Sequence, residues 1–289
     1  LGSSFTPETL SQVSSWVPSV LTMLLFVIVV VAAVGVFLHK AMGFGPVSAY
    51  FSATPGGLAT MVVIGGEMGG DERRIGLTHS IRVMLTVLII PIYFRIFEGY
   101  VPGGLETLGS VIDLSLQDGA ILVSCMLGYP LFKVLRLPSA QILGPMIMSA
   151  IIHVTGLTTA KPPVEIVNIA QVVIGTGIGA RFVGVSVVRL YMVIVAAAGG
   201  TVFMVGFAAV AALALEALTG LPFVAIWLAF APGGVAEMTL ISLALGIDVA
   251  FVSTHHLVRV VFMVTAAPLV FHFIDKKWGL REDPNDHKF

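Results

Sequence analysis

The stretch TPGGLATMVVIGGEMGGD, from Thr54 to Asp71, interrupts a long apolar segment with a proline, several glycines and two acids. A second copy, APGGVAEMTLISLALGID, runs from Ala231 to Asp248, at an offset of 177 residues. When residues 54–94 are compared with residues 231–271, 14 of the 41 gapless pairs are identical. A match of this length without a gap exceeds what a shared apolar composition produces. The chain therefore contains an internal duplication.

The composition is that of a membrane protein. Of the 289 residues, 57% are hydrophobic and only 11% are charged, and the mean hydropathy is +1.02. A soluble domain carries about 25% charged residues, and a bilayer-spanning helix needs about 20 apolar residues. These values predict an all-α polytopic membrane protein whose partner is the lipid bilayer. The net charge of −1 predicts no nucleic-acid partner. The single Cys125 predicts no cysteine-based metal site, and we expect no metal and no cofactor.

The duplication divides the chain into two repeats of unequal length. The second repeat, 119–275, contains six apolar segments, which are 119–135, 138–155, 163–181, 190–216, 222–247 and 249–273. The first repeat, 1–98, contains only the last three, which are 17–39, 45–70 and 72–97. Because Leu1 aligns with Ile178, we expect the first repeat to be truncated at its N-terminus by about 60 residues, the distance from residue 119 to residue 178. An external linker, 99–118, joins the repeats, and a cytoplasmic tail, 276–289, follows the second.

Basic residues in short loops mark the cytoplasmic side of a membrane protein. Arg181 and Arg189 flank one loop of the second repeat, whereas the equivalent loop of the first repeat has no base. Conversely, Lys40 follows a segment of the first repeat, whereas the equivalent loop of the second repeat has none. Lys276 and Lys277 follow the last segment and place the C-terminus in the cytoplasm. Equivalent loops thus carry opposite signals, which predicts that the two repeats are inverted relative to each other.

Inversion requires an odd number of crossings in each repeat, so one of the six segments must not cross. Segments 45–70 and 222–247 contain the Pro-Gly-Gly breaks, and we expect both to be re-entrant, broken hairpins. Broken helices in two inverted repeats are typical of secondary transporters, so we expect a transporter-like fold.

The breaks supply the first candidate binding residues. Proline donates no backbone N–H, and glycine permits tight turns and close approach. The helix that begins after each break presents N–H groups that attract anions. The alternative is that the glycines only permit close helix packing. The candidates are Pro55, Gly56, Gly57, Pro232, Gly233 and Gly234.

Charged residues follow each break at the same spacing. Arg82 and Arg259 lie 11 residues beyond Asp71 and Asp248, about 16 Å along a helix and thus near the middle of a core about 30 Å thick. An arginine at that depth costs about 2.5–3.5 kcal/mol. A histidine lies three residues before each arginine, on the same helix face. Two interpretations stay open: substrate or proton handling, or a buried structural pair that bonds to hairpin carbonyls. The two histidines are His79 and His256.

The remaining candidates break the symmetry or sit at helix ends. Asp71 and Asp248 are expected to be helix N-caps rather than ligands. Glu237 stands where the first repeat has Thr60, and it caps a helix or binds a coupling cation. Gln171, among glycines in an apolar segment, lines a cavity or bonds a neighbouring helix.

Three motifs resemble the membrane AbrB family, a family of duplicated integral membrane proteins. They are LRLPSAQILGPMIMSAI at 135–151, AQVVIGTGIGARF at 170–182, and the paired PGG…D…H..R pattern. Members carry two full repeats, so the short first repeat departs from the pattern. The resemblance implies a multi-pass protein of the bacterial inner membrane, related to inverted-repeat carboxylate and cation–proton transporters. Members also bear labels as regulators of gene expression or ammonia monooxygenases.

These observations favour a secondary transporter of a small anionic or zwitterionic solute over an enzyme, with no catalytic residue. The alternative is a membrane protein that regulates or senses gene expression indirectly. The chain has no basic face for phosphates. Its seven histidines are dispersed, which argues against the clustered ligands of a copper or iron oxygenase. The sequence is also compatible with a homo-oligomer.

Overall fold

The computed structural model describes residues 2–97, 99, 108–135, 140–180, 182–183 and 187–278. All regular elements in these ranges are helices. The short 3₁₀ turns are η1 (Gly2–Ser4), η2 (Val13–Trp16), η4 (Val111–Asp113) and η5 (Cys125–Leu127). The α-helices are α1 (Pro7–Gln12), α2 (Val17–Lys40), α3 (Pro46–Ala53), α4 (Leu58–Glu67), α5 (Glu72–Phe97), α6 (Leu116–Ser124), α7 (Gly128–Val134), α8 (Ala140–Val154), α9 (Val164–Ala180), α10 (Val187–Thr219), α11 (Phe223–Phe230), α12 (Val235–Ala244) and α13 (Val249–Trp278).

Four helices in the described ranges are long and apolar enough to cross a bilayer. The spans are Val13–Lys40, Glu72–Phe97, Tyr191–Thr219 and Val249–Lys276, and the shortest has 26 residues. A crossing helix needs about 20. The prediction of an all-α polytopic membrane protein is confirmed in this coarse form.

The duplicated Pro-Gly-Gly stretches, 55–57 and 232–234, each separate two short helices, α3 from α4 and α11 from α12. The residue before a proline is pushed toward extended backbone, and Thr54 and Ala231 adopt ψ angles of 118° and 140°. At the first break, Gly57 has a φ of 89°, a conformation that only glycine adopts without strain. The local chemistry of the sequence therefore ends α3 and α11 where they end.

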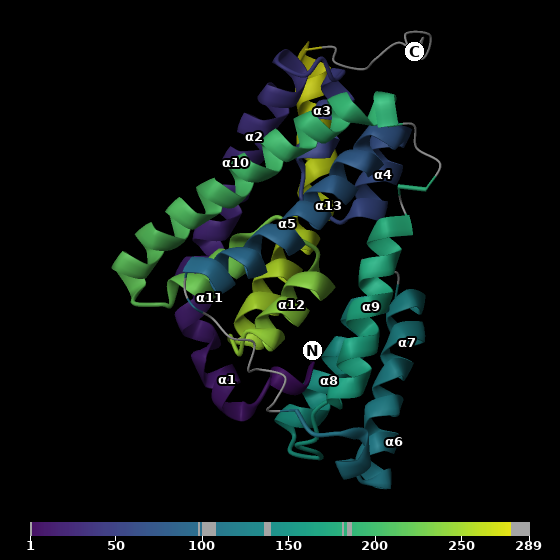
Figure 1. Cartoon of the computed structure of the whole chain (residues 1–289), viewed down its shortest axis with the longest axis vertical. Helices are drawn as coiled ribbons and strands as arrows, with labels where there is room; N and C mark the ends of the chain where they lie inside the picture. The colour runs from purple at the N-terminus through teal and green to yellow at the C-terminus, as the bar shows by residue number, and fades with distance from the viewer. Residues whose placement is uncertain are drawn as a thin grey trace.

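The duplicated sequence packs in a duplicated way. Helices α2, α3, α4 and α5 correspond to α10, α11, α12 and α13. Within each set the same pairs touch, and across the sets α5 packs on α10 as α13 packs on α2. Likewise α12 touches α5, and α4 touches α13. Equivalent helices run in opposite directions in Figure 1: α2 and α13 rise toward the top of the view, whereas α10 and α5 descend.

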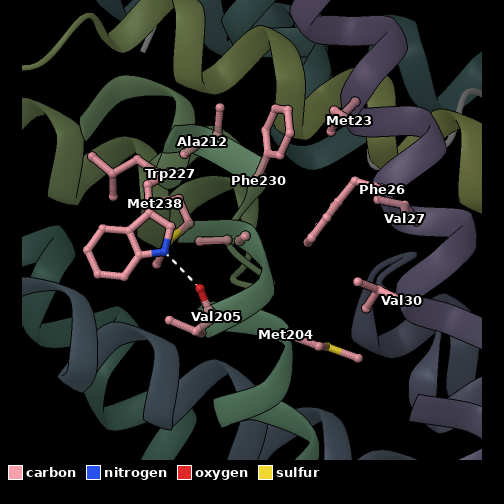
Figure 2. Packing of buried hydrophobic residues seen from close by; sticks show 14 of the residues in the cluster. Met23, Phe26, Val27, Val30, Met204, Val205, Ala212, Trp227, Phe230 and Met238 are labelled. Carbon is pink, nitrogen blue, oxygen red and sulfur yellow. Dashed lines mark hydrogen bonds between the residues drawn. The ribbon is translucent and has the colours of Figure 1, made fainter. Parts of the chain in front are cut away.

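A buried apolar cluster joins the two sets of helices. Figure 2 shows Phe26 and its α2 neighbours facing Phe230 of α11, and their ring centroids are 5.4 Å apart. The indole N–H of Trp227 donates to the carbonyl oxygen of Val205 at 2.9 Å. On the opposite face of α2, Leu21 and Leu25 are more than 60% exposed. A bilayer covers such a face.

The helices α6 to α9 form the rest of the second repeat. A Cβ atom on Gly128 of α7 would lie against the backbone of Gly144 of α8, and the reverse also holds, so these glycines let the helices touch closely. Helix α6 begins at Leu116, inside the expected linker 99–118, of which residues 100–107 lie outside the described part. Helix α13 continues to Trp278, and residues 279–289 of the expected tail also lie outside it.

Candidate functional site

The arginine of the second repeat binds the break directly. Arg259 donates from Nη1 to the carbonyl oxygen of Ala231 at 2.6 Å and from Nη2 to that of Gly233 at 2.7 Å. Nη2 also donates to Nδ1 of His256 at 2.8 Å. The Nε2 atom of His256 lies 2.9 Å from the carbonyl oxygen of Leu228. Both side chains are buried, with 2% of Arg259 and none of His256 exposed.

The first repeat makes the same histidine contacts but a weaker arginine contact. Nε2 of His79 lies 2.9 Å from the carbonyl oxygen of Phe51, and Arg82 Nη2 donates to Nδ1 of His79 at 2.8 Å. The only carbonyl that Arg82 reaches among the described residues is that of Ser52, at 3.4 Å. Arg82 is 5% exposed.

The prolines explain why a histidine is needed at these positions. In an α-helix the carbonyl of residue i−4 accepts from the N–H of residue i, but a proline at i has no N–H. Pro232 and Pro55 therefore leave the carbonyls of Leu228 and Phe51 without their helical donor. The histidine of each repeat lies at hydrogen-bond distance from that carbonyl. The break and the histidine 24 residues after its proline form one unit.

The contacts also fix the protonation of both histidines. A carbonyl oxygen only accepts, so Nε2 carries the hydrogen; a guanidinium only donates, so Nδ1 accepts. Each ring is therefore neutral, and a second proton on Nδ1 would break the bond to arginine. The geometry favours a positioning role for His79 and His256 over proton handling.

The positive charge of the two arginines has no acidic partner in the described part of the chain. Buried polar side chains there include two arginines and four histidines, but neither aspartate nor glutamate. The ion pair found in this part, between Arg74 and Asp71 at 3.4 Å, lies elsewhere. A buried charge without a counter-charge is costly. A ligand of opposite charge would offset that cost.

The helices after the breaks begin without a side-chain cap. Gly57 and Gly234 occupy the N-cap positions of α4 and α12, and neither helix has a side-chain hydrogen bond at its cap. Thr60 and Glu237 lie in the first turns, and the Glu237 carboxylate folds against the position that a Cβ of Gly234 would take. Uncapped N–H groups at a helix start are donors for an anion.

The two aspartates lie at the starts of the long helices. The Asp71 carboxylate accepts from the backbone N–H of Arg74 at 3.0 Å, and the Asp248 carboxylate accepts from that of Phe251 at 3.0 Å. This is the geometry of an N-cap.

Other predicted residues lie around this centre. Pro55, Gly56, Pro232 and Gly233 are buried at the breaks. Gln171 is partly exposed on α9, a helix that packs against α5 and α12. Its side chain has no hydrogen bond to either of the two histidine–arginine pairs.

Sequence reasoning missed several contacts. Ser52, which lies against Arg82, has no polar counterpart in the second repeat, because Ala229 occupies that position. His255 is fully buried and bonds to Ser19 of α2 at 2.8 Å, thereby joining α13 to α2. The duplicated histidines and arginines carried a signal in the sequence, whereas the small residues and backbone atoms that they contact did not. Within the described ranges, no three His, Cys, Asp or Glu side chains gather as metal ligands do.

The fold and the site define a class of protein: a polytopic, all-helical membrane protein with duplicated broken helices and buried arginines at the breaks. The sequence profile of the AbrB family, described as "Transition state regulatory protein AbrB", matches residues 1–275. The chain belongs to this family.

Two relatives illustrate the family. The chain is 26% identical over 298 aligned positions to "Uncharacterized protein YhjN" of Bacillus subtilis (strain 168), covering 98% of this chain and 78% of that protein. It is 23% identical over 269 positions to "Putative regulator AbrB" of Escherichia coli (strain K12), covering 89% and 74% of the two chains. No solved structure matches the chain.

Proposed function

We propose that this protein is a secondary transporter of a small anionic or zwitterionic solute in the bacterial inner membrane, and that it is not an enzyme. The observation that carries the proposal is the pair of buried arginines at two helix breaks, Arg82 and Arg259, which have no acidic partner among the residues that the structure describes. Fixed neutral histidines hold both guanidinium groups in place. A carboxylate that enters between the breaks would gain charge-assisted hydrogen bonds.

The proposal includes an inverted-repeat topology. Residues 1–98 and 119–275 form the repeats, and each Pro-Gly-Gly break is the turn of a re-entrant hairpin. Support comes from the opposite directions of equivalent helices in Figure 1. The helix ends at the top of that view include the end of α2 with Lys40 and the start of α5 with Arg73 and Arg74. By the positive-inside rule this side is cytoplasmic, with the C-terminus.

The proposed solute site lies where the two breaks meet the long helices. A Cβ on Gly56 would lie 3.0 Å from the Cβ of Met263, so the first break approaches α13 of the other repeat. The uncapped starts of α4 and α12 and both arginines would contact the solute. Alternating access would then move one set of helices against the other.

A second candidate function rests on names alone. The family description and the Escherichia coli relative are both worded as regulators. A membrane protein that regulates indirectly would change gene expression without moving a solute. Solute flux therefore distinguishes the two candidates.

The test is flux across a defined membrane. The purified full chain, reconstituted into proteoliposomes, is screened with radiolabelled organic acids and amino acids chosen by thermal shift. We expect saturable uptake of an anionic or zwitterionic compound that Arg259→Gln and Arg82→Gln abolish. Empty liposomes and a surface variant, Glu8→Gln, are the controls. No uptake of any compound that stabilises the protein would count against transport.

A further inference from the structure

The two buried arginines are not equivalent. Arg259 has strong acceptors for both terminal nitrogens, at 2.6, 2.7 and 2.8 Å. Arg82 has one strong acceptor, His79, and one long contact at 3.4 Å. The Nε atoms of both arginines lack a partner, but only Arg82 lies beside a second unpaired group, the hydroxyl of Ser52. The terminal nitrogens of Arg82 in the first repeat therefore have fewer acceptors than the equivalent nitrogens of Arg259 in the second.

A small cavity adjoins these donors. Its volume is about 10 Å³, and residues of helices α2, α3, α5 and α10 line it. Its polar lining residues are Ser52, Thr78, Arg82 and Thr201. A cavity of this size holds about one water-sized sphere. Its size suits a ligand of a single atom.

The hydrogens of the lining residues point to an anion. Thr78 and Thr201 already donate to backbone carbonyls of their own helices, at 2.8 and 2.6 Å. The unused donors at the cavity are the Arg82 guanidinium and the Ser52 hydroxyl. Arg82 carries a charge that no acid in the described part of the chain neutralises.

We infer that the cavity between α2, α3, α5 and α10 is a halide-sized anion site, which takes chloride through Arg82 and Ser52. The site exists only in the first repeat. The counterpart of Ser52 is Ala229, and the guanidinium of Arg259 is turned to the carbonyls of the second break. The inference shares Arg82 with the proposed function but tests binding of a halide, independently of solute flux.

The experiment compares anions at equal ionic strength. The purified full chain in detergent is titrated with sodium chloride or bromide in a sodium gluconate background, and its melting temperature is recorded. Gluconate is too large for the cavity. We expect a saturable rise with either halide, because a ligand that binds only the folded state raises the melting temperature.

Matched variants locate the effect. Ser52→Ala removes the hydroxyl and leaves the residue that repeat two carries, and Gly200→Ala adds a methyl group to the cavity wall, 3.2 Å from Val34. Ser52→Ala is expected to weaken halide binding about tenfold or more, the effect of one charge-assisted hydrogen bond. Gly200→Ala is expected to weaken it by taking up space in the cavity. Ser80→Ala is the control, because Ser80 is a buried serine of α5 outside this cavity.

Several outcomes overturn the inference. Equal melting temperatures in chloride and gluconate would mean that the cavity holds water only. A halide effect that Ser52→Ala and Gly200→Ala leave unchanged, or that Ser80→Ala removes equally, would place the anion elsewhere. Arg82→Gln is expected to abolish the effect, and the other two variants decide the matter if that variant fails to fold. If the protein binds halide but takes up no solute, only the transport proposal is contradicted.

Discussion

Replacing Arg259 by alanine is expected to destabilise the protein more than replacing Arg82 by alanine. The two side chains have the same size and nearly the same burial, with 2% and 5% exposed. Each bonds its histidine at 2.8 Å. Both alanine variants therefore lose the same volume, remove one buried charge and lose one histidine contact. These effects on the free energy of unfolding cancel when the two variants are compared.

The difference between the two variants comes from the hydrogen bonds to the backbone carbonyls of the breaks. Arg259→Ala leaves the carbonyls of Ala231 and Gly233 without their donors, which lie at 2.6 and 2.7 Å. Arg82→Ala loses only a long contact of 3.4 Å. An unsatisfied buried carbonyl costs about 1–3 kcal/mol, so two of them give a difference of about 2–6 kcal/mol in the free energy of unfolding.

The assay is reversible unfolding of the purified variants in mixed detergent and SDS micelles. Tryptophan fluorescence reports on the break, because Trp227 is buried on α11 and its indole bonds to Val205. Equal unfolding free energies for the two variants, or a lower value for Arg82→Ala, would refute the claim that Arg259 braces the second break. Denaturation in SDS alone, without refolding, gives only the order of the variants, which is enough for this comparison.

Three further predictions test other parts of the reasoning. Cysteines placed at Lys40 and at its equivalent, Ala217, in a cysteine-free background should be labelled from opposite sides of the membrane; labelling of both from one side contradicts inversion. His256→Ala should cost less in a Pro232→Ala background, because residue 232 then has an N–H for the freed carbonyl; a double-mutant cycle of unfolding free energies measures this, and additivity contradicts it. Hydrogen bonds from the hydroxyl groups of Ser115 and Thr158 lower the pKa of Asp118. Its contribution to stability is therefore present above the usual aspartate pKa of about 3.9 and is lost as the pH falls through the pKa of the folded state. The melting temperature should decline more steeply in acid for the wild type than for Asp118→Asn, and identical slopes contradict this.

Much of the helical organisation follows from the sequence. The expected segments 45–70 and 222–247 each became two helices, divided at the predicted prolines. The expected segment 72–97 matches the bounds of α5. These features depend on apolar length and on proline and glycine chemistry, which are local. The expected start of segment 119–135 was three residues late, because Leu116 already begins α6, and helix ends depend on capping contacts.

The candidate site was predicted less completely. The sequence singled out His79, Arg82, His256 and Arg259 through their repetition. It left open whether these residues bind a ligand or brace the backbone, and in the structure both histidines and Arg259 bond to backbone carbonyls at the breaks. The role of Ser52 carried no signal, because a serine in an apolar helix is common and its counterpart is alanine.

The sequence by itself determined that this chain is a duplicated, helical membrane protein with two broken helices and an arginine buried after each break. These properties follow from hydropathy, from prolines that lack an N–H, and from a repeated motif. Only the tertiary structure decided that the freed carbonyls face the histidines, that Arg259 bonds to the break, and that Arg82 faces a small cavity. The reason is physical: α10 closes that cavity with Thr201, about 120 residues from Arg82 in sequence, and such a contact depends on how the helices pack.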